Sequence, residues 1–449
     1  MELMNTIFDN IYTNNWDNNI QLLKDNINIL DLNIQINNIY LIELIIIHNR
    51  YDIFKLISHK NIYFEIYTKE NMPIIFYLIK YNYSKLLELI LKKKIIIGLS
   101  IFDIKNNKGE NILLYSIKLN NTITTTILLK YLSSIDISSN DNNTIYHYIA
   151  KFNNIDIMKK VIIDRGILNK QNNNGETCLH IAINNNNNNN IINYILENKI
   201  DIFIKDFEYK FTSIHYIIVK NDIKLLNNII NKYDINYNIQ DIYGRTYLHF
   251  FVIYDMLNIL ENILTTNKNI NYNINTIKGY TILHLVLISY EKYDDLKNLL
   301  KILIKNTNLN IQDNDGNTCL FYLIKLNIWE DYINEILEKK LDIYIYNNNN
   351  ELIYDLIKNN KKFINLLVDI YYNKIISNKK YITNNLNECF NKNNNKIFKE
   401  KIKNLIIKDR ISFPISKNKT CIKIEKPEKV GYVSYSGTNL DIICGLYYL

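Results

Sequence analysis

The sequence of 449 residues contains little glycine, proline or cysteine, with 10, 3 and 5 residues of these types. Three prolines exclude a collagen-like or proline-rich chain, and 47% apolar residues argue against a wholly disordered one. The five cysteines are scattered and contain no C-x-x-C pair, which excludes a zinc ribbon and argues against a disulfide framework. We therefore expect a protein of a reducing compartment.

Long apolar runs are also missing. A membrane span needs 18 or more apolar residues, and the richest stretch, 39–47, is interrupted by Glu43. The first residues lack the basic and apolar regions of a secretory signal peptide. We expect a soluble, monomeric, cytoplasmic protein.

Asparagine and tyrosine are abundant, with 78 and 36 residues. Together with the many isoleucines and lysines, they match what AT-rich codons encode, so we interpret the excess first as genome bias and only second as chemistry. The run Asn184–Asn190 has two interpretations. It is either an asparagine ladder for self-association or a neutral insertion in an exposed loop or helix end, and we favour the insertion.

A repeated motif runs through most of the chain. The clearest copy spans residues 241–249 and reads D-x-x-G-x-T-x-L-H. Eroded copies recur on both sides of it, at intervals of between 33 and 38 residues. The residues in the histidine slot of the successive copies are Glu43, Phe76, Leu114, His147, His180, His215, His249, His284, Phe321 and Asp355.

This motif and its period resemble those of the ankyrin-repeat family over residues 1–372. The resemblance implies an all-α solenoid, a stack of about ten helix-turn-helix repeats with hairpin tips, in which the first two or three copies are degenerate. Stacked copies share one continuous core that no copy can bury alone. A second amphipathic helix is expected behind each motif, for example over residues 223–232.

Each motif residue has a local physical reason. Glycine is needed where the hairpin takes positive φ, threonine can cap the N–H groups at the start of the first helix, and histidine can bridge groups of neighbouring repeats. Gly166 is expected to cap the end of a second helix. The repeat-motif residues are Gly109, Thr144, His147, Gly175, Thr177, His180, His215, Gly244, Thr246, His249, Gly279, Thr281, His284, Gly316 and Thr318.

Catalytic and cofactor chemistry is not indicated. Five histidines occupy one slot of successive repeats, too far apart to share a zinc ion, so we interpret them as structural. Cys178 and Cys319 are expected to be buried rather than reactive. No P-loop, G-x-S-x-G or H-E-x-x-H motif occurs. We predict that the protein is not an enzyme and uses no cofactor or metal.

Partner binding is expected at the hairpin tips and the concave face of the first helices, as the family resemblance implies. Tyrosine at a tip gives a large contact area at low entropic cost. With 36 tyrosines, some must lie at tips by composition alone. The candidate contact residues are Asp206, Phe207, Tyr209, Asp241, Tyr243, Arg245, Tyr247, Lys278, Tyr280, Asp313 and Asp315.

The C-terminal part departs from the repeat. Residues 373–410 are expected to form a basic, Asn/Lys-rich helical linker, and residues 411–449 a β-hairpin followed by a helix. Such a segment is too small to be stable alone. It either docks on the stack or begins a further domain of a longer protein, and we favour the second. Residues 374–429 carry 15 Lys+Arg against 5 Asp+Glu, the sole candidate for binding nucleic acid; a solvated linker is favoured.

The composition, the repeat and the tail together resemble the large ankyrin-repeat proteins of giant DNA viruses, and secondarily those of poxviruses. The resemblance implies a non-enzymatic scaffold that binds partner proteins, host proteins of the host-cell cytoplasm if the chain is viral. The alternative is a substrate-targeting subunit for an enzyme or ubiquitin-ligase complex, carried or recruited by the C-terminal segment. No L-P-x-E start of an F-box is found there, which weakens the ubiquitin-ligase version.

Overall fold

The fold is that of a computed structural model, which describes residues 21, 25–26, 35–36, 39–57, 72–93, 101–132, 134–185, 189–293, 296–342, 345–353 and 356. The chain divides into two compact units, Met1–Lys358 and Asn359–Leu449, and every described residue lies in the first. The expected array end at 372, the linker 373–410, the segment 411–449 and the basic stretch 374–429 lie outside the described residues.

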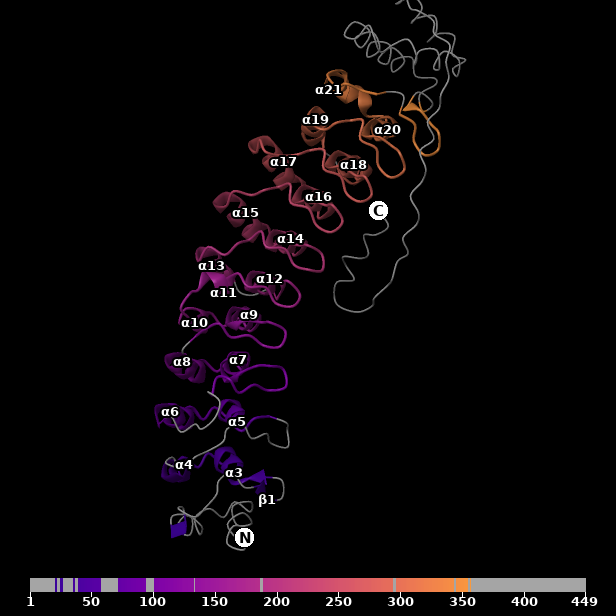
Figure 1. The fold of residues 1–449 in the computed structure, drawn as a ribbon. Helices are drawn as coiled ribbons and strands as arrows, with labels where there is room; N and C mark the ends of the chain where they lie inside the picture. Colours follow the sequence, from indigo (N-terminus) through magenta and orange to yellow (C-terminus); the bar gives the residue numbers. More distant parts are fainter. Residues whose placement is uncertain are drawn as a thin grey trace, which may run out of the picture. The chain divides into compact units, whose positions relative to one another are not determined.

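Pairs of short helices follow one another through the described part of the chain (Figure 1). The first helices are α3 Leu41–Ile47, α5 Ile75–Lys80, α7 Ile112–Lys118, α9 Ile145–Lys151, α12 Cys178–Asn184, α14 Ser213–Val219, α16 Tyr247–Ile253, α18 Ile282–Ile288 and α20 Cys319–Lys325. The second helices are α4 Tyr51–Ile57, α6 Ser84–Lys93, α8 Thr122–Tyr131, α10 Ile155–Met158, α13 Asn189–Glu197, α15 Ile223–Lys232, α17 Leu257–Thr266, α19 Lys297–Asn306 and α21 Ile333–Leu337.

Smaller elements complete the description. The short helix α11 spans Arg165–Leu168, and the 3-10 turns η1 and η2 span Tyr290–Lys292 and Trp329–Tyr332. The strands β1 Gln35–Ile36 and β2 Ile39–Tyr40 pair antiparallel just before α3. The expected second helix over 223–232 is confirmed by α15.

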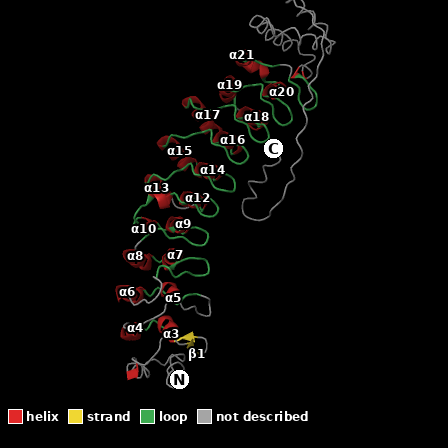
Figure 2. Cartoon of the chain, viewed as in Figure 1, coloured by secondary structure: helices red, strands yellow, loops and turns green. Residues whose placement is uncertain are grey.

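The helix pairs stack because each first helix contacts the first helix of the next pair, as α14 does with α16 and α16 with α18. Figure 2 shows that the loops joining one pair to the next extend to the side of the first helices. Ile217, Phe251, Leu283 and Leu320, one in each of four successive first helices, are at most 1% exposed. Together they belong to one continuous apolar core, in which each repeat depends on its neighbours.

Seven of the first helices are followed by a left-handed residue, which is asparagine in six of them and aspartate in one. Asn82 follows the C-cap of α5 with φ of 59° and donates its N–H to Ile79, while Tyr83 donates to Leu78. These two bonds form a Schellman motif, and asparagine adopts the left-handed conformation more readily than other residues except glycine. The same slot holds Asn49, Asn120, Asn153, Asn221, Asp255 and Asn327, with φ between 51° and 58°.

Asparagine side chains also join neighbouring repeats. Asn238 Oδ1 accepts the N–H of Asn271 at 2.8 Å, and its Nδ2 donates to the carbonyl of Asn269 at 3.0 Å. Asn310 makes the same two bonds to the backbone of Asp342 and Lys340, both at 2.8 Å. Each of these amides therefore clamps the backbone of the following repeat. These asparagines thus have a defined structural role, while genome bias as the source of their abundance stays a prediction.

Two other expectations, for Gly166 and for the asparagine run, concern the segment from α10 to α13. Gly166 does not cap a second helix: it lies inside α11 and is not among the positive-φ residues. The reason is that the chain leaves α10 at Met158 and starts a separate short helix, capped by Asp164. The run Asn184–Asn190 covers the end of α12 and the start of α13, with 186–188 outside the described residues.

Candidate protein-binding surface

Most hairpin tips are folded by the side chain of their first residue. Asp241 Oδ1 accepts the N–H of Tyr243 at 2.9 Å and of Arg245 at 2.7 Å, so the carboxylate holds the turn closed. The bridge between Gln240 and Thr246 closes the base of this tip. The same pair of turn bonds forms at Asn106, Asn172, Thr276, Asp313 and Asn347.

The fourth tip residue has positive φ, as expected for the motif glycines. Gly109, Gly175, Gly244, Gly279 and Gly316 have φ between 70° and 79°. At Gly279 a Cβ atom would lie 2.6 Å from the Cα of Asp313 in the next repeat, so the close approach of two tips also requires glycine. Asn142 and Asn350 occupy the same slot with φ of 57° and 59°. In the tip that starts at Asp206, which is one residue longer, the positive-φ residue is the fifth, Lys210, with φ of 58°.

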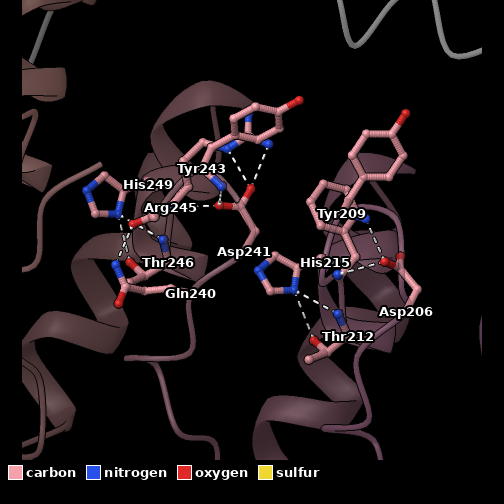
Figure 3. A network of polar contacts seen from close by, with 12 residues as sticks. Asp206, Tyr209, Thr212, His215, Gln240, Asp241, Tyr243, Arg245, Thr246 and His249 are labelled. Carbon is pink, nitrogen blue, oxygen red and sulfur yellow. Dashed lines mark hydrogen bonds and ion pairs between the residues drawn. The ribbon is translucent and has the colours of Figure 1, made fainter. Parts of the chain in front are cut away.

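Each motif histidine completes a capping box at the start of its first helix. In α16 the N–H of Thr246 donates to His249 Nδ1 at 3.1 Å, and the threonine hydroxyl lies 2.8 Å from the same atom (Figure 3). Because Nδ1 accepts a backbone N–H, the ring is neutral and its proton is on Nε2. Equivalent boxes pair Thr144 with His147, Thr177 with His180, Thr212 with His215 and Thr281 with His284.

The far side of the ring reaches the next repeat. His249 Nε2 lies 3.2 Å from the carbonyl oxygen of Tyr280, and His147 Nε2 lies 2.9 Å from that of Glu176. The expected bridge between neighbouring repeats is thus present at these two histidines. Burial lowers the pKa of His180, His249 and His284 to about 4. It also lowers the pKa of His147, and it lowers that of His215 well below its usual value.

Backbone hydrogen bonds join each tip to the next. Ile242 N–H donates to Tyr209 O and Ile277 N–H donates to Tyr243 O, both at 2.9 Å. The same bond joins the second residue of five further tips to the preceding tip, at Asn140, Asn173, Phe207, Asn314 and Asn348. The tips therefore form a ladder whose exposed side chains are held at fixed spacing.

Comparison with known proteins agrees with this geometry. Residues 123–206 match the family model described as Ankyrin repeats (3 copies), and the same helix pair, capping box and tip continue beyond residue 206. The chain carries ankyrin repeats. The predicted family is therefore confirmed.

Two individual proteins are similar to it. An ankyrin repeat protein of Acanthamoeba polyphaga mimivirus is 32% identical over 464 aligned residues, covering 96% of this chain and 59% of that protein. The chain thus spans less than two thirds of the length of this giant-virus relative. A chain of the solved complex between the Bd0816 predatory endopeptidase of Bdellovibrio bacteriovorus and immunity protein Bd3460 is 16% identical, with a TM-score of 0.36. That match covers 44% of this chain and 100% of the other.

Several predicted contact residues are structural parts of the ankyrin tips instead. Asp206, Asp241 and Asp313 are only 2%, 7% and 5% exposed, because their carboxylates accept the N–H groups of their own turns. Tyr247 was expected at a tip, but it lies in the first turn of α16 and is fully buried. Its hydroxyl lies 2.7 Å from Thr212 Oγ1 in the preceding repeat, so it is a core residue.

Arg245 is half-buried and engaged within its own repeat. Its Nε donates to Asp241 Oδ2 at 2.8 Å. The guanidinium carbon lies 4.9 Å from the ring centre of Tyr243 and 4.5 Å from that of Phe250. Arg245 therefore supports the tip and holds the Tyr243 ring, and its charge is compensated by Asp241.

The remaining candidates lie on the outer surface of the ankyrin tips. Phe207, Lys278 and Asp315 are exposed, and Tyr209, Tyr243 and Tyr280 are partly exposed. In Figure 3 the rings of Tyr209 and Tyr243 extend in the same direction, away from the capping threonines. The structure thus brings aromatic side chains of successive tips onto one surface.

A polar hollow of about 380 Å³ lies between the tips and first helices of the repeats that contain α9 and α12. Its lining includes Asp141, Lys151, Glu176 and the asparagines Asn173 and Asn185. The hollow contains both signs of charge and several amides, so it favours a polar contact rather than an apolar anchor.

Two exposed residues of the tips were missed by the sequence reasoning, Ile242 and Ile277. They occupy the second tip position and are 52% and 61% exposed. A column of that position through the copies reads Asn107, Asn140, Asn173, Phe207, Ile242, Ile277, Asn314 and Asn348. The change from asparagine to apolar residues is visible in this column, but only once the tips have been aligned by their first residue.

The other motif predictions are consistent with the structure, with one exception. Cys178 and Cys319 are fully buried, and burial raises the pKa of Cys178 to about 12, as expected for unreactive thiols. Thr318 precedes α20, but Phe321 occupies the histidine slot there and no capping box forms. No helix in the described part of the chain is long and apolar enough to cross a membrane.

Proposed function

We propose that the chain is a non-enzymatic scaffold that binds a partner protein through its ankyrin tips and the adjoining faces of the first helices. The observation that carries this proposal is the backbone ladder between successive tips. Because the ladder fixes the tips, the side chains on them are preorganised, and binding a partner costs little ordering entropy.

The proposed contact region comprises the tips that precede α14, α16, α18 and α20. Its aromatic residues are Phe207, Tyr209, Tyr243 and Tyr280, of which Phe207 is 54% exposed. Large, rigid side chains of this kind contribute most of the binding energy in many protein interfaces. The similarity to a mimivirus protein supports host proteins as the partner class, with host-cell cytoplasm as the place of action.

The test replaces the three partly exposed tip tyrosines together, as Tyr209→Ala, Tyr243→Ala and Tyr280→Ala. Proteins captured from a host-cell lysate by the wild-type chain and by the variant are quantified by mass spectrometry. We expect the specifically captured protein to fall about ten-fold or more, because removing several central aromatic contacts costs more than 1.4 kcal/mol.

The control replaces tyrosines outside the tips that are more exposed than the tip tyrosines, Tyr51→Ala, Tyr81→Ala and Tyr131→Ala, at 40%, 39% and 38% exposure. This variant should capture the partner as well as the wild type does. Equal capture by the tip variant, at an unchanged melting temperature, would contradict the proposed function.

A further inference from the structure

Three consecutive ankyrin tips depart from the others at their second residue. Asn173, Asn314 and Asn348 donate their side-chain amides to the carbonyl of the second residue in the preceding tip, at 3.2, 3.0 and 2.7 Å. These bonds add a side-chain rung to the backbone ladder. Phe207, Ile242 and Ile277 stand at the same position and have no amide to donate.

The substitution exposes apolar surface where the other tips are polar. Phe207, Ile242 and Ile277 are 54%, 52% and 61% exposed, and the backbone ladder places them on successive tips. We call these three residues the apolar stripe. An exposed row of apolar side chains that also gives up three hydrogen bonds is not explained by stability, so it indicates an interaction surface.

The stripe also leaves backbone acceptors available. The carbonyl oxygens of Asn173, Phe207 and Ile242 receive no side-chain amide from the next tip, because that tip carries Phe or Ile. Equivalent carbonyls at Asn140, Ile277 and Asn314 do accept one, so this position can be reached from the tip surface. A partner with unpaired backbone N–H groups can therefore donate to it, which favours an extended segment over a helix.

The charged residues around the stripe indicate the net charge of the partner. Lys205, Lys210 and Lys278 are exposed on the same tips, whereas Glu208 is the exposed acid among them in the described residues. Lys205 Nζ donates to the carbonyl of Gln240, and Lys210 Nζ lies 5.6 Å from the ring centre of Phe207. The lysines thus flank the apolar side chains, and an acidic partner is favoured.

The separation of neighbouring stripe residues indicates the backbone conformation of the partner. Packed helices lie roughly 8–10 Å apart, so neighbouring stripe residues are separated by about that distance. A polyproline II segment rises about 3.1 Å per residue with three residues per turn, which places every third side chain on one edge at about 9.3 Å. Its backbone N–H groups have no internal hydrogen bonds.

We propose that the apolar stripe of Phe207, Ile242 and Ile277 binds an extended, acidic peptide segment that carries an aliphatic side chain at every third residue. This inference rests on the proposed function and specifies its partner. The aliphatic side chains contact the stripe, the acidic ones lie near Lys205, Lys210 and Lys278, and backbone N–H groups donate to the available carbonyls.

The probe is a synthetic peptide of repeated Leu-Glu-Ser triplets with a fluorescent label, and binding to the full chain is measured by fluorescence anisotropy. Comparison probes are repeated Leu-Lys-Ser triplets, repeated Ala-Glu-Ser triplets and single-stranded oligothymidine. We expect the Leu-Glu-Ser peptide to bind about ten-fold or more tightly than each comparison probe, and less tightly as salt is raised.

The decisive variant is Phe207→Asn, Ile242→Asn and Ile277→Asn, which installs the residue that the other tips use. It should fold with an equal or higher melting temperature, because asparagine can restore the rungs, and should bind the Leu-Glu-Ser peptide about ten-fold more weakly or worse. The control variant, Ile123→Asn and Ile162→Asn, removes apolar residues that are 63% and 81% exposed elsewhere and should bind normally.

Three results would overturn the proposal: no binding of the Leu-Glu-Ser peptide, equal binding of the basic peptide or of oligothymidine, or normal binding by the asparagine variant. None of them decides the proposed function, which is tested by protein capture with the tyrosine variant. Capture that depends on the tip tyrosines without peptide binding would leave the scaffold role intact and remove the extended acidic segment as its partner class.

Discussion

At the scale of single residues, asparagine occupies left-handed turn positions that glycine more often fills. Asn82 and Asn221 end first helices with positive φ, and Asn142 fills a tip position where other repeats have glycine. This explains how a chain with 10 glycines can build so many left-handed turns. Composition could not reveal it, because a left-handed asparagine is recognised by its place after a helix end and not by its abundance.

Asn221 allows the residue-scale prediction. It is exposed, follows the C-cap of α14 and has φ of 55°. Asn221→Ile should lower the free energy of unfolding by about 1–2 kcal/mol, because a β-branched residue is strained in the left-handed region, whereas Asn221→Gly should change it little. Urea unfolding measures both. Asn227→Ala, at an exposed position within α15, is the matched control and should leave the free energy of unfolding unchanged or raise it slightly, because alanine favours helix. An unchanged free energy of unfolding for Asn221→Ile would refute the argument.

At the scale of elements, the sequence predicts the features that depend on a local residue pattern, such as helix ends and capping boxes. The amphipathic period located α15 at its observed ends, and the T-x-L-H pattern located the capping boxes. Tyr247 was misplaced because the tip ends at Thr246 and the next side chain turns into the core, a one-residue difference that pattern alone does not resolve. Of the apolar stripe, the sequence reasoning identified only Phe207. It missed Ile242 and Ile277 because their exposure depends on how neighbouring tips stack.

The joint between repeats gives the element-scale prediction. Asn238→Ala removes both bonds to the backbone at Asn269 and Asn271, and should lower the free energy of unfolding by about 1–2 kcal/mol. Hydrogen–deuterium exchange should rise most in residues 267–275. Asn238→Asp keeps the acceptor but loses the amide donor, so its effect should be intermediate. Exchange that rises uniformly along the chain, or not at all, would argue against a local clamp.

At the scale of the whole molecule, the histidines make the stack sensitive to acid. Five successive first helices each bury one neutral imidazole in a capping box. A repeat depends on its neighbours for its core, so weakening several joints at once lowers the stability of the array rather than of one repeat. The acid sensitivity follows from the presence of a capping-box histidine in each of five successive repeats, and a single repeat would show it only weakly.

The stack should therefore lose stability as pH falls from about 6.5 towards 4. Burial holds the pKa of His180, His249 and His284 at about 4, against 6.5 when exposed, so in this window the unfolded chain binds more protons than the folded one. Each such histidine should contribute a loss on the order of 2 kcal/mol at about pH 5, measured by urea unfolding across the pH range.

The variant His249→Phe separates this effect from general acid sensitivity, because the chain itself places Phe321 in the same slot of α20. The variant should be less stable at neutral pH, since the N–H of Thr246 loses its acceptor. It should also lose less stability between neutral pH and about pH 5 than the wild type, because one titrating imidazole is gone. An unchanged pH dependence in the variant would show that carboxylates, and not the buried histidines, set the acid response of the array.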